Sequence, residues 1–262
     1  MDIDNGIASA TSGAARMRTV QRRMDLPHAV VVRRSAEWEK FAETDAFGYI
    51  MTDLAGGEPQ VFWDSGRSTI LKEVLPVITE FGVNRDTALE IGCGVGRLIF
   101  PLCEIFRNVI GADISAGMIG RARGFAEERS VANAHFIQVS QASDLLAAMA
   151  DVTGRATFVY SLLVFQHIED FQTIDSYLAA IGQVLSRDGV AYLQFDTRRR
   201  TPAYGMKTAL PDFVLPKFWR RGVRRIRQSP DDIRRSLGKN HLRILAEKSP
   251  QSAYHRYVVG LA

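Results

Sequence analysis

Short apolar runs alternate with longer segments of helical periodicity through the central and C-terminal parts of the chain. Each run is bounded by Gly, Asp or Ser and is too short for a helix, which is typical of strands buried on both faces of a parallel sheet. The predicted strands are Thr87–Ile91, Asn108–Ala112, His135–Val139, Thr157–Leu163, Val190–Phe195, His241–Glu247 and His255–Gly260. The intervening segments predict helices over Gly96–Phe106, Ala116–Glu128, Ser143–Ala150, Thr173–Leu185 and Asp231–Leu237. This alternation predicts an α/β fold with a doubly wound, mostly parallel, seven-stranded sheet.

The N-terminal part of the chain has a different pattern. Residues 1–34 are rich in Ala, Ser, Gly and Arg without a sustained period, which predicts a flexible tail. Residues 35–82 predict a helical lead-in or cap, with a loop through Ala55–Pro59 and a helix over Ser68–Phe81. Residues 83–262 then follow as one domain.

Composition excludes several classes of protein. A content of 46% hydrophobic and 24% charged residues is ordinary for a globular chain. No apolar run approaches the ~20 residues of a membrane-spanning helix, and the N-terminus resembles no secretory signal, so we expect no transmembrane segment and a cytoplasmic protein. The two cysteines, Cys93 and Cys103, make no disulfide framework or Cys-rich zinc site, and we expect no metal.

The charge is distributed unevenly along the chain. Residues 197–229 hold ten Lys and Arg and one acid, a net charge of +9 against +4 for the whole chain, so the remainder carries −5. Tyr204, Phe213, Phe218 and Trp219 are interleaved with these cations. The block follows the fifth predicted strand and precedes the closing helix, so we predict that it is an insertion between these two elements.

Three glycines stand where the first predicted strand meets the first helix. Gly92, Gly94 and Gly96 allow a tight turn and close approach of the backbone to a ligand. A dinucleotide fingerprint requires glycine at position 97, where this chain has Arg. Glu90, two residues before the first glycine, predicts a cationic or donor-bearing ligand rather than a phosphate.

Asp113 ends the second predicted strand, 21 residues after Gly92, where a carboxylate can accept both hydroxyls of a ribose. Glu90, the glycine loop and Asp113 together predict a nucleoside with a positively charged tail. At these residues the chain resembles the class I S-adenosylmethionine-dependent methyltransferases of small-molecule type, whose first motif reads acid-x-Gly-x-Gly-x-Gly. The resemblance implies a Rossmann-like fold and S-adenosylmethionine as cofactor.

The resemblance extends over residues 86–197. Asp113, Ile114 and Ser115 with Met118 are similar to the second-strand motif, and Gln141 with Ala142 occupies the place of an Asp-Ala pair. There Gln141 replaces the acid that accepts the adenine amino group, and its amide carbonyl can accept the same bond. The implied cofactor contacts in this core are Glu90, Gly92, Cys93, Gly94, Gly96, Asp113, Ile114, Met118, Gln141, Ala142 and Ser161.

The lead-in resembles a subgroup of these enzymes that has an aromatic-x-Ser-Gly element and is associated with sugar or polysaccharide modification. Here the element is Phe62-Trp63-Asp64-Ser65-Gly66. We expect Tyr49 and Trp63 to cover the cofactor pocket, since an aromatic face attracts a sulfonium, and Arg67 to pair with the cofactor carboxylate. The alternative is that these aromatic residues only pack the lead-in onto the sheet.

His167 is the candidate general base. It follows the fourth predicted strand, within a segment that resembles the Gln-His-Ile of small-molecule members, and an imidazole is largely a free base at neutral pH. A structural histidine is the alternative, and Glu169, Asp170 and Asp196 are other candidate acids, which also cap helices. The Asn/Asp-Pro-Pro-aromatic motif of adenine or amide methylation is absent after this strand.

The position of the basic block resembles that of a lid over the acceptor site, so Arg200, Tyr204 and Trp219, with Tyr49, are candidate substrate contacts. Cations and aromatic rings suit an anionic or glycosylated small molecule. The sequence thus predicts a methyltransferase acting on a sugar, glycoside or natural-product hydroxyl. An RNA methyltransferase docking through residues 197–229, a non-catalytic cofactor-binding protein, and a solvated or membrane-surface basic stripe stay open as alternatives, and the oligomeric state is not predicted.

Overall fold

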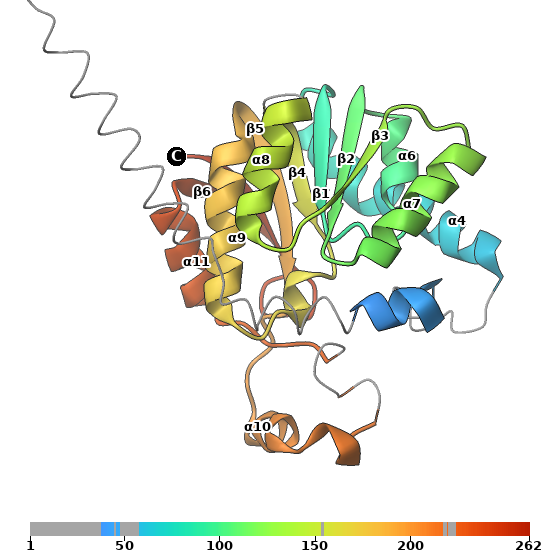
Figure 1. The fold of residues 1–262 in the computed structure, drawn as a ribbon. Coiled ribbons are helices and arrows are strands. Elements are labelled where there is room, and N and C mark those ends of the chain that lie inside the picture. Colours follow the sequence, from blue (N-terminus) through green and yellow to red (C-terminus); the bar gives the residue numbers. More distant parts are fainter. Residues whose placement is uncertain (1–37, 45, 48–57, 153–154, 217–218, 220–223) are drawn as a thin grey trace, which may run out of the picture.

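The computed structural model describes residues 38–44, 46–47, 58–152, 155–216, 219 and 224–262, which form a seven-stranded sheet with helices on both faces (Figure 1). The strands are β1 (Thr87–Ile91), β2 (Asn108–Asp113), β3 (Ala134–Gln138), β4 (Ala156–Ser161), β5 (Leu185–Phe195), β6 (Leu242–Lys248) and β7 (His255–Leu261). Their order is β3-β2-β1-β4-β5-β7-β6, and β7 runs antiparallel to both β5 and β6. The predicted fold class is thereby confirmed.

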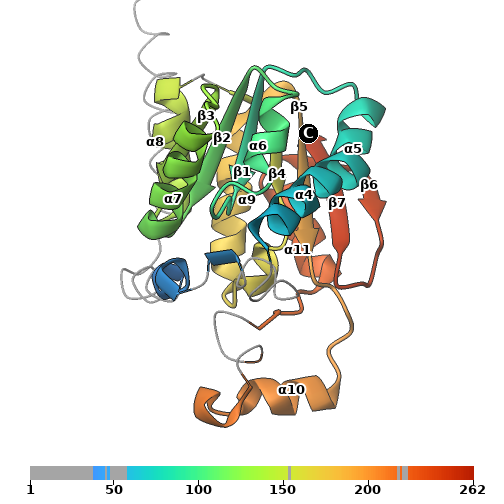
Figure 2. The same cartoon turned by 90° about the vertical axis from the view of Figure 1, so that its right-hand side faces the viewer.

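Two apolar layers cover the sheet. One face packs against α8 (Ala142–Val152), α9 (Phe171–Val184) and α11 (Pro230–Lys239). The other face packs against the π-helical turn η2 (Ile70–Val74), α5 (Leu75–Glu80), α6 (Ile99–Cys103) and α7 (Ala116–Glu128), with α4 (Pro59–Thr69) on the same side (Figure 2). All five residues of β1 are buried, as expected for a central strand covered on both faces.

Side-chain caps fix where several helices begin. The Ser115 hydroxyl accepts from the backbone N–H of Met118 at the start of α7, and Ser229 caps α11 in the same way. The Asp170 carboxylate accepts from the N–H groups of Gln172 and Thr173 at the start of α9, so the capping role considered for this acid is confirmed. Because α7 follows β2, its cap places the helix N-terminus at the carboxyl end of the strand.

The lead-in differs from its prediction. Helical structure is continuous from Pro59 to Glu80, so it begins nine residues before the predicted helix over Ser68–Phe81, and the element that contains Trp63 and Gly66 lies inside α4. Pro59 at the first helical position starts the helix, because its missing N–H is not needed there. Residues 38–44 and 46–47 are also helical, and Ala42 and Ala46 pack with Phe62, Val95 and Met118.

Two further elements depart from their predicted bounds. The first helix after the glycine loop begins at Ile99 instead of Gly96, because the glycines impose a turn before it. Residues 202–209 form α10 (Pro202–Ala209) inside the basic block, where no helix was predicted. There Pro202 stands at the start of the helix and Thr201 caps it, and both residues favour helix formation.

Candidate active site

The glycine loop turns back sharply between β1 and α6. Gly92, Gly94 and Gly96 have φ angles of 81°, 53° and 91°, a backbone conformation that other residues adopt only with strain. A Cβ at position 92 would lie 2.8 Å from Cγ1 of Val164 and closer still to Cγ2. The glycine loop therefore touches the segment that follows β4.

Asp113 organises the edge of this loop. Its carboxylate accepts from the Gly94 N–H at 2.8 Å and from the Ser115 N–H at 3.0 Å. Burial raises the pKa of Asp113, and the hydrogen bonds from Ser115 and Gly94 act in the opposite direction by stabilising the charged form. The side chain remains partly accessible at the end of β2, so its oriented oxygens can accept further donors such as ribose hydroxyls.

Glu90 has a protein partner instead of facing a ligand. It lies beside Tyr160 of β4 in the sheet register, and the Tyr160 hydroxyl donates to its Oε2 at 2.8 Å. Burial is the main cause that raises the pKa of Glu90 to about 8, and the nearby Arg97 opposes the shift. Glu90 thus makes a buried contact that joins β1 to β4, and its role in recognising a cationic ligand stays a prediction.

Arg97, which stands where a dinucleotide loop would have glycine, ties the glycine loop to α4. Its guanidinium is almost completely buried and donates to the Ser65 hydroxyl at 3.2 Å and to the Thr69 hydroxyl at 3.4 Å. A Cβ at Gly66 would overlap the Arg97 carbonyl oxygen. The Ser-Gly part of the lead-in element therefore supports the glycine loop from behind, a role that the sequence did not predict.

Trp63 and Arg67 lie away from the glycine loop. The Trp63 ring packs against Phe100 and Phe125, and the Arg129 guanidinium lies 4.2 Å from its centroid. Arg67 pairs with Glu104 at 2.6 Å, at an exposed position. Glu104 follows α6 and Arg129 follows α7, at the ends of these helices remote from the carboxyl edge of the strands. These contacts favour the packing alternative for Trp63, and the contacts of Trp63 and Arg67 with the cofactor stay predictions.

The other predicted cofactor residues divide into supporting and accessible ones. Cys93, Met118, Ala142 and Ser161 are buried, and the Ser161 hydroxyl donates to the Ile91 carbonyl at 3.0 Å. These four shape the walls of the site. Ile114 and Gln141 are partly accessible beside Asp113 and at the start of α8, which leaves both side chains available for a ligand.

His167 ends a short 3-10 turn, η3 (Phe165–His167), directly after β4. Leu163 has a φ of 64° and makes the sharp turn that leads from the strand into η3. Gln166 is buried, and its Nε2 lies 3.1 Å from Nε2 of His167. The Trp38 ring meets the imidazole edge-on at 5.9 Å between centroids. The candidate base therefore lies between the end of β4 and the lead-in.

Glu39 joins the same lead-in to the cofactor side of the site. Its carboxylate accepts from the Ser115 hydroxyl at 2.7 Å and from the Gly117 N–H at 2.8 Å, at the N-terminus of α7. An acid is favourable there, because it satisfies backbone donors and the helix dipole. Neither Trp38 nor Glu39 was predicted, and their position on a helix close to an aromatic element gave no specific signal.

The insertion, residues 197–229, leaves the sheet at the end of β5 and returns past His167. The Ile226 N–H donates to the Gln166 carbonyl at 2.6 Å, and Gln228 Nε2 donates to the Ile168 carbonyl at 3.1 Å. Arg224 is buried and pairs with Glu169 at 2.7 Å. This return arm, residues 224–228, fixes the loop that carries the candidate base.

The predicted substrate residues of the insertion have partners within it. Arg200 donates to the Arg227 carbonyl at 2.7 and 2.9 Å, and the Tyr204 hydroxyl donates to the Arg225 carbonyl at 3.2 Å. Trp219 lies under the Lys207 ammonium, 4.5 Å from its ring centroid. Arg200 and Tyr204 therefore hold the insertion together. Tyr49 lies outside the described residues.

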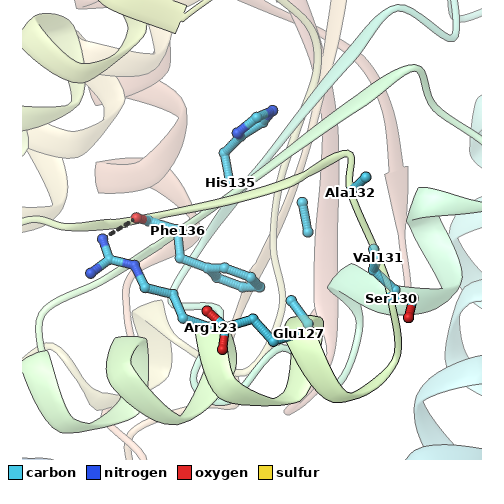
Figure 3. A pocket seen from close by; sticks show the side chains of 9 residues that line it. Arg123, Glu127, Ser130, Val131, Ala132, His135 and Phe136 are labelled. Carbon is cyan, nitrogen blue, oxygen red and sulfur yellow. Dashed lines mark hydrogen bonds between the residues drawn. The ribbon is translucent and has the colours of Figure 1, made fainter.

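A separate hollow of about 650 Å³ lies between α7 and β3 (Figure 3). Arg123, Glu127, His135 and Phe136 line it, and Arg123 donates to the Phe136 carbonyl at 2.7 Å. Its lining includes residues 130–132, in the connection between α7 and the start of β3. The hollow therefore lies toward the amino ends of the strands, whereas the glycine loop lies at their carboxyl ends. We therefore place the candidate active site elsewhere.

Comparison with known proteins agrees with this geometry. Residues 88–189 match the family model described as a methyltransferase domain. A methyltransferase from Clostridium acetobutylicum that depends on S-adenosylmethionine has the same fold, with a TM-score of 0.56 and 16% identity over 72% of this chain and 89% of that one. Magnesium protoporphyrin IX methyltransferase from Synechocystis, with bound S-adenosylmethionine, gives 0.56 and 18% identity over 87% and 97%.

Fold and family match point the same way. Residues 88–189 match a methyltransferase domain, and the fold is the one found in S-adenosylmethionine-dependent methyltransferases. Among curated proteins the chain is similar to a ubiquinone biosynthesis O-methyltransferase of Brucella ovis, at 26% identity over 159 residues. That match covers 60% of this chain and 60% of the relative, so the chain spans less than two thirds of the relative's length. No helix among the described residues is long and apolar enough to cross a membrane.

Proposed function

We propose that this protein transfers the methyl group of S-adenosylmethionine to a hydroxyl of a small molecule, with His167 as general base. The contact between Gly92 and Val164 carries the proposal. Val164 precedes His167 by three residues, so the loop that would hold the cofactor and the loop that bears the base touch each other. A donor and an acceptor bound to the two loops would be neighbours.

The residues present fit the cofactor. Gly92, Gly94 and Asp113 combine a tight glycine turn with an oriented carboxylate, and Ile114 and Gln141 provide apolar and amide surface beside it. The buried Oε1 of Gln166 has no hydrogen-bond partner among the described residues, so it offers an acceptor to a donor on a ligand. Bound S-adenosylmethionine would supply an electrophilic methyl group on a positively charged sulfur.

The protein's own contribution is orientation and proton removal. The two loops would align the acceptor oxygen with the methyl group, and the His167 imidazole would take the hydroxyl proton as the methyl group leaves sulfur for that oxygen. Trp38 covers the imidazole from one side, which limits access of water to it. S-adenosylhomocysteine and the methyl ether are the products.

We propose a sugar, glycoside or natural-product hydroxyl as the acceptor. The aromatic-x-Ser-Gly element of the lead-in supports the sugar reading, and the name of the Brucella relative supports transfer to oxygen. The insertion adds cations and aromatic rings beside the return arm, which suits an anionic or glycosylated molecule. A library of glycosylated and phenolic small molecules is therefore the appropriate set of methyl acceptors to test.

The test separates cofactor binding from catalysis. Calorimetry with S-adenosylmethionine should give binding to the wild type and to His167→Gln with similar affinity. Methyl transfer to the library, followed with radiolabelled cofactor, should fall about 100-fold or more in the variant, since general bases contribute at least that much. Absence of cofactor binding in the wild type would refute the proposal, and equal loss of binding and turnover in His167→Gln would make His167 structural.

A further inference from the structure

The insertion displays apolar side chains to solvent. Met206 is 73% exposed, Leu210 45%, Phe213 84% and Val214 54%. We call these four residues the apolar tip. Met206 lies on α10, Leu210 directly follows it with an extended backbone, and Phe213 and Val214 lie on the next turn, η4 (Asp212–Val214). Four large apolar groups so close together in the chain are unusual on a protein surface that has no partner.

The insertion also carries positive charge that no carboxylate of the described residues pairs. Of the described basic residues in the insertion, Arg198 pairs with Asp196 and Arg224 pairs with Glu169. The remaining ones have no carboxylate partner among the described residues: Arg199, Arg200, Lys207, Arg225 and Arg227. Since the chain outside the insertion carries −5, the insertion holds both the excess positive charge and the apolar tip.

Hydrogen bonds and a cation–π contact fix the base of the insertion, so the base holds the apolar tip in a defined position. Arg227 Nη1 donates to the Arg199 carbonyl at 2.6 Å, and the Arg227 guanidinium lies 4.3 Å from the centroid of the Tyr204 ring. The Tyr204 hydroxyl also accepts from the Arg227 N–H at 3.1 Å. No residue of α10 is buried, and the helix stands outside the helical layers, beyond the edge of the sheet (Figures 1 and 2).

From these observations we infer that the insertion docks the protein on the surface of an anionic lipid bilayer. The cations of the base contact lipid phosphates, and the apolar tip enters the boundary between headgroups and acyl chains. Aliphatic side chains such as Met206, Leu210 and Val214 gain from burial in acyl chains but find no stacking or hydrogen-bonding partner on a nucleic acid. The acidic remainder of the chain is repelled by the same lipids, which orients the molecule with the insertion toward the membrane.

Vesicle sedimentation tests this inference with the full chain. One set of vesicles consists of phosphatidylcholine alone, and the other contains phosphatidylglycerol as well. We expect the protein to sediment with the second set and not with the first. The variant Met206→Ser/Phe213→Ser should weaken that binding about tenfold or more, because both side chains lose their insertion into the boundary region. Added salt should weaken it further.

The matched control is Val61→Ser/Leu71→Ser, which removes two apolar side chains of 47% and 52% exposure from α4 and η2. The control should bind vesicles as the wild type does, and thermal unfolding should show all three proteins folded. The inference would be overturned if the wild type did not sediment with the anionic vesicles, if the control lost as much vesicle binding as the tip variant, or if the tip variant bound as the wild type does. Preferential binding of total RNA over the vesicles would also overturn it. Since vesicle binding requires no cofactor, either result leaves the proposed methyl transfer unaffected.

Discussion

Replacement of Gly92 by alanine tests the contact on which the proposed function depends. At a φ of 81°, an alanine costs about 1 to 2 kcal/mol in backbone strain. Its Cβ would also overlap both γ-carbons of Val164, and overpacking of this kind costs about 1 to 3 kcal/mol. The variant should therefore lose about 2 to 5 kcal/mol of stability, and it should bind S-adenosylmethionine more weakly because the loop must move.

A double-mutant cycle separates the two contributions. Val164→Ala removes both γ-carbons, so Gly92→Ala/Val164→Ala should recover the steric part of the loss and retain the backbone part. Thermal unfolding measures the four proteins, with a shift of about 2 to 4 °C expected per kcal/mol for a chain of this size. Calorimetry with S-adenosylmethionine follows the same cycle. Additive effects of the two changes, or undiminished cofactor affinity in Gly92→Ala, would show that the two loops do not touch as described.

Two further predictions concern buried or partly buried carboxylates. The pKa of Glu90 is raised from 4.5 to about 8, so the folded protein holds a proton that the unfolded chain releases, and this group lowers stability as pH rises through that window. Glu90→Gln keeps an acceptor for Tyr160, so its thermal unfolding temperature should rise relative to wild type between pH 4.5 and about 8; a difference independent of pH would contradict the assignment. Glu39→Ala removes the acceptor of two hydrogen bonds at the start of α7 and should cost about 1 to 2 kcal/mol, with weaker cofactor binding by calorimetry. Glu39→Gln should restore most of the stability and most of the cofactor affinity. If Glu39→Ala bound the cofactor as tightly as the wild type, a role for the lead-in in the site would be excluded.

The sequence predicted the elements whose signal is local. The limits of β1 and α7 are the predicted ones, because a fully buried strand and a Ser-capped helix each have a clear pattern. The glycine loop could be predicted equally well from the sequence, since its three positive φ angles fall on glycines. Local patterns of this kind located the carboxyl edge of the sheet and therefore the position of the candidate site.

The contacts within the site were not predictable in the same way, because they depend on pairing between distant segments. Glu90 meets Tyr160 only through the register of β1 with β4, across seventy positions of the chain. A cationic ligand and a tyrosine hydroxyl both satisfy a carboxylate, and only the register decides between them. Arg67 likewise satisfies its charge with Glu104, and no pattern in the sequence indicates which acid would be nearest.

The two ends of the insertion lie side by side. The Gln228 N–H donates to the Asp196 carbonyl at 2.7 Å, and Asp196 and Arg227 form an isolated parallel bridge. The chain thus leaves and re-enters the domain at one point, so the outer part of the insertion can be lengthened or shortened without displacing β5 or α11. The return arm has no such freedom, because it is bonded to the loop that bears His167, and any change in its backbone reaches that loop.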